Sequence, residues 1–496
     1  MEYRATTASL RNHPLPAWYE DAKLGIFIHW GLFSVPAWAP MSGEVTKVIA
    51  EQGWKAWFTN NAYAEWYLNT MRIADSPTAR YHTATYGDMP YEGFAPLFNR
   101  AVRDWDPAPF ANVLREAGAK YAVLVTKHHD GFTLWPSRQP NPNRPGFHAE
   151  RDLVGDLSSA VRAQGMAMGL YYSGGLDWTF KHPVIEDITD MINCIPQDSA
   201  YIAYADGHWH ELIERYQPAV LWDDIGYPYK ANVRQLFAEY YNHCPNGVIN
   251  DRFTQPVLND VTKKFWTSRT GQWLLTRLLQ SKPKARGSSK PRLPNLVHYD
   301  FTTPEYASYK GIMPYKWEAT RGLGFSFGYN RDEGPDKTLS VSELVHFLVD
   351  VVSKNGNLLL NIGPMADGTI PPIQLERLQG LGQWLAVNGE AIYSTRPWRR
   401  SEGAVQDGPA VRFTCCGEKL YAILLGMPGR DTVVLEHLAA IPTSQVRLLG
   451  HSEPLTWSME KGGLRVMLPP EVKPAPAIAL AITPQPQWTG PTEDGK

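Results

Sequence analysis

The strongest constraint on the fold is the alternation of short apolar runs with helical patterns between about residues 20 and 395. This alternation is typical of βα units arranged around a parallel sheet. Strands are expected at Gly25–Gly31, Tyr121–Thr126, Ala167–Ser173, Ala219–Asp224, Gly247–Asp251, Val297–Thr302 and Asn357–Gly363. Helices are expected at Leu153–Gln164, His208–Tyr216, Val233–Tyr241, Ser340–Lys354 and Leu375–Val387. This many units favours an α/β fold with a closed (β/α)8-like barrel over an open doubly wound sheet.

The pattern changes after Arg396. Short apolar runs punctuated by Gly, Pro and Asp follow at Val411–Cys415, Lys419–Leu425, Thr432–Leu435, Gln445–Leu449, Leu464–Met467 and Ala477–Ile482. Such spacing predicts an antiparallel β-sandwich. We therefore expect two domains, a barrel over residues 1–396 and a C-terminal β-sandwich over residues 397–496.

Composition excludes several classes of protein. Hydrophobic residues make up 43% of the chain and charged residues 20%, so a large core is available and global disorder is excluded. The net charge of −2 gives no reason to expect a nucleic-acid or membrane partner. Residues 1–14 lack the apolar core of a signal peptide, and the four cysteines lack metal-type spacing. We expect a reduced, cytoplasmic protein and leave a homo-oligomer open.

One segment has a charge unlike the rest of the chain. Residues 261–299 contain nine Lys or Arg and no Asp or Glu. We expect residues 262–296 to form a mobile, protease-sensitive loop between two barrel elements. A patch that binds RNA or another polyanion, a lid and an oligomer contact remain as alternatives.

Polar side chains follow several of the expected strands. Active sites of barrels lie at the carboxyl ends of the strands, so these positions are candidate site residues. They are His29, His128, His129, Tyr172, Ser173, Asp223, Asp224 and Arg252.

The octamer Leu221–Pro228 places an aromatic ring beside a carboxylate. Side chains alternate along a strand, so Trp222 and Asp224 share one face while Asp223 points to the other. This pairing is typical of a sugar site, although both aspartates could instead cap the next helix or bind a structural arginine.

Glycoside hydrolysis also needs a second carboxylate. Glu305, which follows another expected strand, at Val297–Thr302, is a candidate. Asp300 and Glu318 compete with it, and the sequence spacing does not choose among the three.

Two other motifs suggest different chemistry. His29, His128 and His129 could bind a metal, but the usual metal-binding spacings are absent, and adjacent histidines at a strand end suit hydrogen bonds to sugar hydroxyls. We expect no metal and no cofactor. Gly324–Gly328 matches the Gly-x-Ser-x-Gly elbow of esterases, but a loop sequence follows it where that motif needs a helix.

Taken together, the motifs resemble the α-L-fucosidase family of retaining glycoside hydrolases over about residues 15–400. The matching segments are Trp18–Gly31, Ser34–Trp38, Ala117–Phe132, Arg151–Asp156, Gly169–Ser173, Leu221–Pro228, Lys316–Gly324, Ser326–Asn330 and Gly356–Pro364. The resemblance implies a catalytic (β/α)8-like barrel, a C-terminal β-sandwich, and a fucosylated oligosaccharide or glycoconjugate as substrate.

The resemblance also implies roles for individual residues. It places the nucleophile at Asp224 and the acid/base at Glu305. Residues that bind the sugar or surround the nucleophile would be His29, Glu65, Trp66, His128, His129, Tyr171 and Arg252. An apolar wall for the 6-deoxy methyl group would be formed by Phe27, Trp222 and Phe327. The basic segment before Glu305 is longer than is usual in the family, so Asp300 and Glu318 stay open as alternatives.

A member of the family could also have lost its catalysis and bind fucose as a lectin. A metal-dependent hydrolase that uses the histidine cluster is a further alternative.

Overall fold

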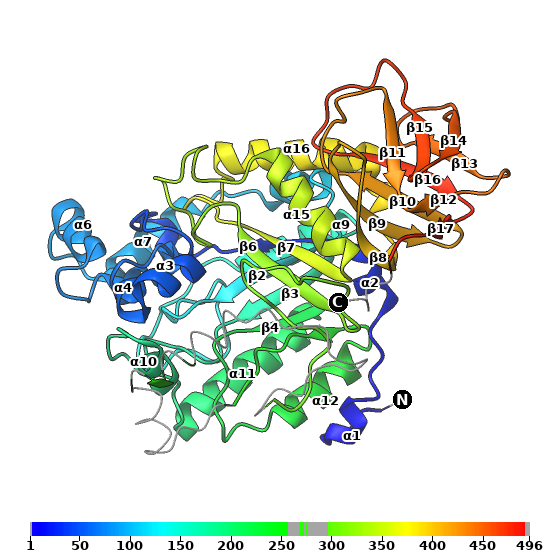
Figure 1. Ribbon diagram of the computed structural model, residues 1–496. Helices are drawn as coiled ribbons and strands as arrows, with labels where there is room; N and C mark the ends of the chain where they lie inside the picture. Colours follow the sequence, from blue (N-terminus) through cyan, green and yellow to red (C-terminus); the bar gives the residue numbers. More distant parts are fainter. Residues whose placement is uncertain (1, 256–267, 269, 272–273, 275–295, 492–496) are drawn as a thin grey trace.

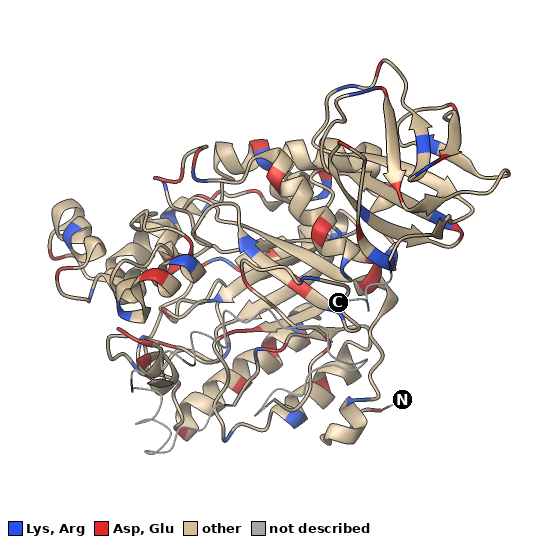
Figure 2. Ribbon diagram, in the orientation of Figure 1, with Lys and Arg blue, Asp and Glu red and all other residues tan. Residues whose placement is uncertain are grey.

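The computed structural model describes residues 2–255, 268, 270–271, 274 and 296–491. Figure 1 shows a central sheet surrounded by helices and, beside it, a separate C-terminal β domain. The basic segment predicted to be a mobile loop lies outside the described residues, apart from residues 268, 270, 271, 274 and 296. Basic and acidic residues are interspersed along the described helices and strands (Figure 2). In the described part of the chain, no helix has the length and apolar composition to cross a bilayer.

The central sheet is parallel and has the order β5-β4-β3-β2-β1-β7-β6. Its strands are almost entirely buried because helices cover the outside and side chains fill the inside. They are β1 (Leu24–Ile28), β2 (Tyr121–Lys127), β3 (Ala167–Tyr172), β4 (Val220–Asp223), β5 (Val248–Ile249), β6 (Trp317–Gly322) and β7 (Gly356–Ile362).

The ring between β5 and β6 is closed by a segment that is not a strand. A strand was expected at Val297–Thr302, but this segment forms only isolated bridges, from Phe301 to Asn250 and from Thr302 to Trp317. A third bridge joins Glu305 to Thr320. Pro304 interrupts the segment and has no N–H to donate, so a continuous ladder cannot form there.

Strand β6 was not predicted from the sequence. Its residues Glu318 and Thr320 are polar but buried, so the strand does not appear as an apolar run. The expected fold class, a (β/α)8-like barrel followed by an antiparallel β domain, is nevertheless confirmed.

The longer helices that surround the sheet are α8 (Pro107–Glu116), α9 (Leu153–Ala163), α11 (Ser199–Tyr216), α12 (Val233–His243), α15 (Val341–Ser353) and α16 (Pro372–Asn388). Of these, α8 was not expected, α11 begins well before its expected start, and the others differ from the expected ranges by a few residues at their ends. Helix α11 begins well before the expected His208 because the Asp198 side chain accepts a hydrogen bond from the Tyr201 N–H at 2.9 Å.

Most of the remaining helices that the structure describes are shorter. Two of them precede β1, and the others lie in insertions that follow a strand or a helix. Before β1 are α1 (Thr7–Leu10) and α2 (Ala17–Ala22); between β1 and β2 are α3 (Val45–Gln52), α4 (Trp54–Thr59), α5 (Tyr67–Thr70), α6 (Pro77–Tyr86) and α7 (Phe94–Ala101), with 3-10 turns at Leu32–Ser34, Ala64–Trp66 and Tyr91–Gly93. Helix α10 (Ile188–Asn193) follows β3, and a 3-10 turn at Gly389–Ala391 follows α16. Figure 1 shows α3, α4 and α10 beyond one end of the central strands.

The C-terminal domain consists of antiparallel sheets with the orders β13-β16-β10-β9-β8, β11-β15-β14 and β12-β17. Its strands are β8 (Arg396–Ala404), β9 (Ala410–Cys416), β10 (Lys419–Leu424), β11 (Thr432–Glu436), β12 (Leu438–Ala439), β13 (Gln445–Leu448), β14 (Trp457–Glu460), β15 (Gly463–Met467), β16 (Ile478–Thr483) and β17 (Gln487–Trp488). Strand β8 was not expected, because an edge strand carries charged residues that mask the apolar pattern. The domain boundary at residue 396 stays a prediction.

The two domains are joined by specific contacts. The Arg412 guanidinium forms an ion pair with Asp350 of α15 at 2.7 Å, and the Trp384 indole N–H donates to the Ala477 carbonyl at 2.8 Å. These contacts lie on the side of the barrel formed by α15 and α16.

Candidate active site

A cavity of about 740 Å³ opens at the carboxyl ends of the strands. Its wall includes the residues that the family resemblance implied: Phe27, His29, Glu65, Trp66, His128, His129, Tyr171, Trp222, Asp224, Arg252, Glu305 and Phe327. Most of them lie in or just after strands β1 to β4, and Glu305 lies in the segment that closes the ring. Tyr172, Ser173 and Asp223, which were candidates because they follow or end a strand, are buried and do not line the cavity.

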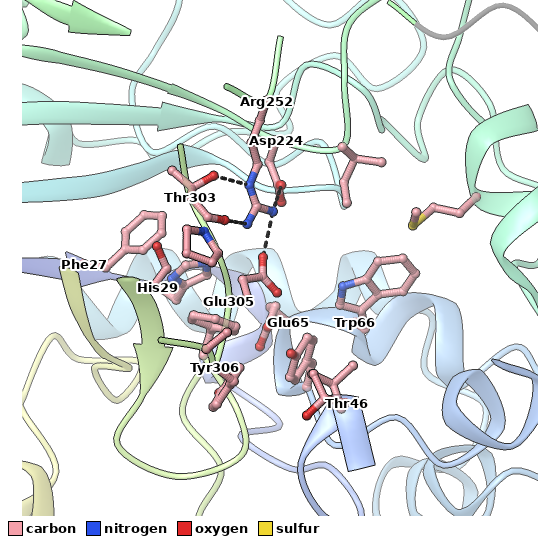
Figure 3. Close-up of a pocket in the computed structure, with 18 of the residues that line it drawn as sticks. Phe27, His29, Thr46, Glu65, Trp66, Asp224, Arg252, Thr303, Glu305 and Tyr306 are labelled. Carbon is pink, nitrogen blue, oxygen red and sulfur yellow. Dashed lines mark hydrogen bonds and ion pairs between the residues drawn. The ribbon is translucent and has the colours of Figure 1, made fainter. Parts of the chain in front are cut away.

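Two carboxylates share one arginine in this cavity (Figure 3). The Arg252 Nη1 atom lies 2.9 Å from Asp224 Oδ1 and 2.6 Å from Glu305 Oε1. The Thr303 hydroxyl and carbonyl accept from the same guanidinium at 2.9 and 3.0 Å, and the Trp222 ring lies 4.8 Å from its central carbon. Arg252 is therefore fixed from all sides and holds the two carboxylates close together.

The environment of Asp224 balances two effects. Burial raises the pKa of Asp224, whereas the Arg252 cation and the Tyr171 hydroxyl, which donates to Oδ2 at 3.0 Å, oppose that rise. Burial by itself disfavours the charged form of Arg252, but the Glu305 and Asp224 carboxylates raise its pKa. The net effect raises the pKa of Asp224, and the adjacent Arg252 cation is its charge partner.

Each of the two carboxylates is followed by a residue in the left-handed backbone region. Ile225 has φ 61° and Tyr306 has φ 46°, and neither is a glycine. A β-branched residue in this region is uncommon and strained. Both of these left-handed residues directly follow a carboxylate that lines the cavity.

The histidines are neutral, and two of them have defined tautomers. Burial lowers the pKa of His29 to about 3 and the pKa of His129 well below its usual value. The Asn361 amide donates to the Phe327 carbonyl at 2.6 Å, so its oxygen accepts from His29 Nδ1 at 2.6 Å. The Ser173 hydroxyl donates to the Leu176 carbonyl at 2.7 Å, so its oxygen accepts from His129 Nδ1 at 2.6 Å.

These contacts leave Nε2 of His29 and of His129 as acceptors. Burial likewise lowers the pKa of His128 well below its usual value. Hydrogen-bond acceptors of this kind suit sugar hydroxyls.

Glu65 is a third carboxyl group in the cavity wall. Burial raises its pKa to about 7, against hydrogen bonds from the Gly328 N–H at 2.7 Å and the Ser326 hydroxyl at 3.3 Å. Ser326 is the serine of the Gly-x-Ser-x-Gly sequence, and its loop is not followed by a helix. The esterase motif is therefore a scaffold for Glu65 and Phe327.

The three side chains expected to form an apolar wall line the cavity and pack beside these polar groups. The rings of Phe27 and Trp222 have centroids 4.9 Å apart, and the ring of Phe327 lies 5.0 Å from that of His29. The three apolar residues are at most 6% exposed, so this wall is dry.

The two competing carboxylates do not line the cavity. Glu318 is buried inside the barrel, where it accepts hydrogen bonds from Tyr19 at 2.8 Å, from Tyr121, and from the Trp222 indole at 3.0 Å. Asp300 accepts from the Tyr241 hydroxyl and the Ile249 N–H, both at 2.8 Å. Both carboxylates are engaged in holding structural elements together.

The alternatives for the aspartate pair are also resolved by the geometry. Asn232, not an aspartate, caps the next helix, and Asp224 does bind an arginine, but within the cavity. Asp223 is buried and absent from the cavity wall, as the strand alternation predicts.

Sequence reasoning missed several residues of the cavity wall. Tyr306 could have been found because it directly follows Glu305. Val45, Ile49, Ile188 and Met191 lie on short insertion helices, and no motif marks them. Within the described residues, no group of three or more His, Cys, Asp or Glu side chains is arranged to hold a metal ion.

Comparison with known proteins gives one consistent family. Residues 1–390 match the family model described as alpha-L-fucosidase, and residues 407–483 match the model of the alpha-L-fucosidase C-terminal domain. The chain is 35% identical to human plasma alpha-L-fucosidase over 94% of this chain and 88% of the relative. It is 34% identical to the rat plasma enzyme over 95% of this chain and 90% of the relative.

A solved structure is also similar over nearly the full length of both chains. The Thermotoga maritima alpha-fucosidase in complex with a mechanism-based inhibitor superimposes with a TM-score of 0.81 and 41% identity, covering 97% of this chain and 100% of that chain.

Proposed function

Because the chain belongs to the α-L-fucosidase family of glycoside hydrolases, we propose that it removes terminal α-L-fucosyl residues from glycans or glycoconjugates by a retaining double displacement. The observation that carries this proposal is the pair of carboxylates that share Arg252 in the cavity.

The separation of the two carboxylates supports retention. Asp224 and Glu305 contact the same nitrogen at 2.9 and 2.6 Å, so their oxygens lie no farther apart than these two distances together. Retaining glycosidases place their carboxyl groups about 5–5.5 Å apart, whereas inverting enzymes need about 6.5–9.5 Å for a water molecule. The geometry fits the retaining class.

In the first step, an Asp224 oxygen attacks the anomeric carbon while protonated Glu305 gives its proton to the glycosidic oxygen. The C–O bond breaks, the aglycone leaves as an alcohol, and a fucosyl ester remains on Asp224. In the second step, the Glu305 carboxylate takes a proton from water, whose oxygen attacks the same carbon and releases Asp224.

The other cavity residues bind and select the sugar. His29 and His129 present Nε2 acceptors to hydroxyl groups, and Glu65 provides a carboxyl group that can accept or donate a hydrogen bond near neutral pH. The apolar wall formed by Phe27, Trp222 and Phe327 receives the 6-deoxy methyl group. A hydroxymethyl group there would lose its hydrogen bond to water without gaining a partner.

The experiment is turnover of an aryl α-L-fucoside, followed by NMR of the first-formed sugar, with and without a chelator. We expect α-L-fucose first and no effect of the chelator. β-L-Fucose as the first product would contradict retention, binding without turnover would favour the lectin alternative, and loss of activity with the chelator would favour a metal-dependent hydrolase.

A substitution in the apolar wall tests the identity of the sugar. Phe327→Ser should reduce the preference for α-L-fucosides over the galacto analogue with a hydroxymethyl group, measured as a ratio of kcat/KM, by roughly 10- to 200-fold. An unchanged ratio in a folded variant would mean that Phe327 does not face the methyl group.

The absence of nucleic-acid and membrane partners, the oligomeric state and the cytoplasmic location stay predictions from the sequence.

A further inference from the structure

The cavity has a second part whose chemistry differs from that of the sugar-binding part. It is lined by Val45, Ile49, Trp54, Ile188, Met191 and Ile225, which we name the outer chamber. Helices α3, α4 and α10 carry all of them except Ile225, and these helices lie beyond the ends of the barrel strands (Figure 1). In Figure 3, Thr46 of α3 lies on the far side of Glu305 from Phe27 and His29.

Unlike the sugar-binding part, the outer chamber offers few polar groups. Thr46 and Ser308 line the cavity nearby, but the Thr46 hydroxyl donates to Glu44 at 3.3 Å and the Ser308 hydroxyl donates to Asp350 at 2.7 Å. The Trp54 indole N–H is buried without a partner among the described residues and could donate one hydrogen bond, and the Thr46 and Ser308 oxygens could accept. A sugar ring carries several hydroxyl groups, so most of them would lose hydrogen bonds to water without gaining a partner in this space. A hydrocarbon or aromatic group would instead remove apolar surface from water.

The position of Glu305 determines which part of the substrate enters the chamber. The leaving oxygen must lie beside Glu305, because that residue protonates it in the proposed mechanism. In Figure 3, Phe27 and His29 lie on one side of Glu305. Glu65, Trp66 and then Thr46 of α3 lie on the other side. With the fucosyl ring packed against Phe27 and His29, the aglycone extends from Glu305 past Trp66 toward the helices that line the chamber.

Ile225 gives an independent reason to regard the chamber as a built site. This β-branched residue follows the nucleophile in the left-handed region, at φ 61°, and its side chain is half-buried in the cavity wall. Neighbouring backbone enforces the turn: the Gly175 N–H donates to the Asp224 carbonyl at 3.1 Å, and a Cβ on Gly175 would lie 2.5 Å from the Ile225 carbonyl oxygen. Glycine would fit the turn without strain, but it would remove an apolar side chain from the chamber.

We propose that the outer chamber binds an apolar aglycone, an alcohol with a hydrocarbon or aromatic body, in preference to a second sugar ring. This inference rests on the proposed function, because it assigns the occupant of the leaving-group side of the same cavity.

The experiment compares methyl, butyl and octyl α-L-fucosides. Their leaving alcohols are similar in acidity, so a difference in kcat/KM reports binding of the chain and not ease of protonation. Each fully buried methylene is worth about fourfold. We expect kcat/KM to rise more than about 10-fold from methyl to butyl, toward a ceiling of about 60-fold.

Two near-isosteric substitutions test whether the chamber causes this rise. Val45→Thr combined with Met191→Gln should reduce the butyl-to-methyl ratio by about 10-fold, because each replaces an apolar contact with a polar group. Val387→Thr and Met427→Gln make the same exchanges at exposed positions, 50% and 36% exposed, and should leave the ratio unchanged.

A butyl-to-methyl ratio of kcat/KM near unity in the unsubstituted protein would overturn the inference. An equal reduction of this ratio by the exposed Val387 and Met427 substitutions would also overturn it. Either result would leave the proposed function intact. A higher kcat/KM for a fucosyl disaccharide than for the octyl fucoside, lost in the Val45/Met191 variant, would show that a sugar occupies the chamber. If no fucoside is hydrolysed, the proposed function fails. Calorimetric affinities for methyl and butyl fucoside then decide the inference, since the gain with chain length must still appear.

Discussion

Trp222 contacts two buried acidic centres that differ sharply in how they are held. Its indole N–H donates to Glu318, which also accepts from the hydroxyls of Tyr19 and Tyr121. Its ring lies against Arg252, which pairs with Asp224 at the cavity. Burial raises the pKa of both carboxyl groups, so burial does not distinguish them.

The difference lies in what remains available after folding. Glu318 is surrounded by three neutral donors inside the barrel and does not line the cavity. Asp224 faces open space and has a cation beside it. Both carboxylates accept hydrogen bonds from fixed donors, so the proposed nucleophile differs from Glu318 in facing the open cavity and in having the Arg252 cation as a direct partner.

The largest effect expected is that of Asp224→Gly, which removes the proposed nucleophile. Hydrolysis should fall on the order of 10⁴-fold or more. Azide should enter the vacated space and displace an activated aglycone with a single inversion, giving β-L-fucosyl azide, detectable by NMR. Asp223→Asn is the matched control, since this neighbour points away from the cavity and should retain most of the activity. Equal losses in the two variants would contradict the assignment.

Glu305→Ala should reduce hydrolysis of fucosides with poor leaving groups by about 10²–10⁴-fold, and that of activated fucosides less. Asp224 still forms the covalent intermediate, which azide opens in a second inversion, so the product should be α-L-fucosyl azide. Near-normal hydrolysis of a poor leaving group, or a β-azide product, would remove Glu305 from the acid/base role.

Glu318→Gln tests the structural side of the comparison. The amide presents an NH₂ group to donors that need an acceptor, so the free energy of unfolding should fall by about 1–3 kcal/mol in urea titrations. Turnover of the folded enzyme should stay within about 10-fold, because the residue does not reach the substrate. The exposed Glu418→Gln is the control and should change stability by less than about 0.5 kcal/mol. A loss of turnover comparable to that of Glu305→Ala would place Glu318 in the catalytic machinery after all.

The smallest effect concerns Glu333, which accepts hydrogen bonds from the N–H groups of Phe325 and Ser326 at 2.7 and 2.8 Å. Burial raises its pKa to about 8. The folded state therefore holds this proton more tightly than the unfolded state, and the stabilisation present below about pH 4.5 is lost as the pH rises through about 8. Glu333→Gln should unfold with a flatter dependence of Tm on pH across this range. Parallel curves for the two proteins would contradict the raised pKa.

The parts of the fold that follow from apolar periodicity could be predicted from the sequence. Strands β2 and β7 are buried along their whole length and contain the apolar runs Tyr121–Val125 and Leu358–Leu360, which mark them in the sequence. Strand β6 could not be found in this way, since Glu318 and Thr320 are buried with partners from distant parts of the chain. A polar residue whose burial depends on tertiary partners carries no local signal.

The cavity residues likewise fall into those that a local sequence pattern marks and those that it does not. Residues at strand ends, such as Asp224 and His129, are marked by their position after an apolar run. The choice of Glu305 over Asp300 and Glu318 required knowledge of which side chains face the cavity, and one residue of register reverses that direction. The outer chamber depends on how insertion helices pack, which no local pattern in α3 or α10 records.

The two carboxylates of the cavity lie on backbone segments that differ in their strand pairing. Asp224 directly follows β4, which is paired with strands on both sides, whereas Glu305 lies in the Pro304-interrupted seam where isolated bridges close the ring. On the β6 side Glu305 is flanked by two backbone hydrogen bonds, from Thr320 N–H to the Pro304 carbonyl and from Tyr306 N–H to the Thr320 carbonyl, both at 3.0 Å, but among the described residues it has no ladder partner on β5. We therefore expect Glu305 to have more freedom to move than Asp224. Such a difference would suit the proposed double displacement. Asp224 would stay beneath the anomeric carbon in both steps, whereas Glu305 would protonate the departing alcohol and then deprotonate the incoming water.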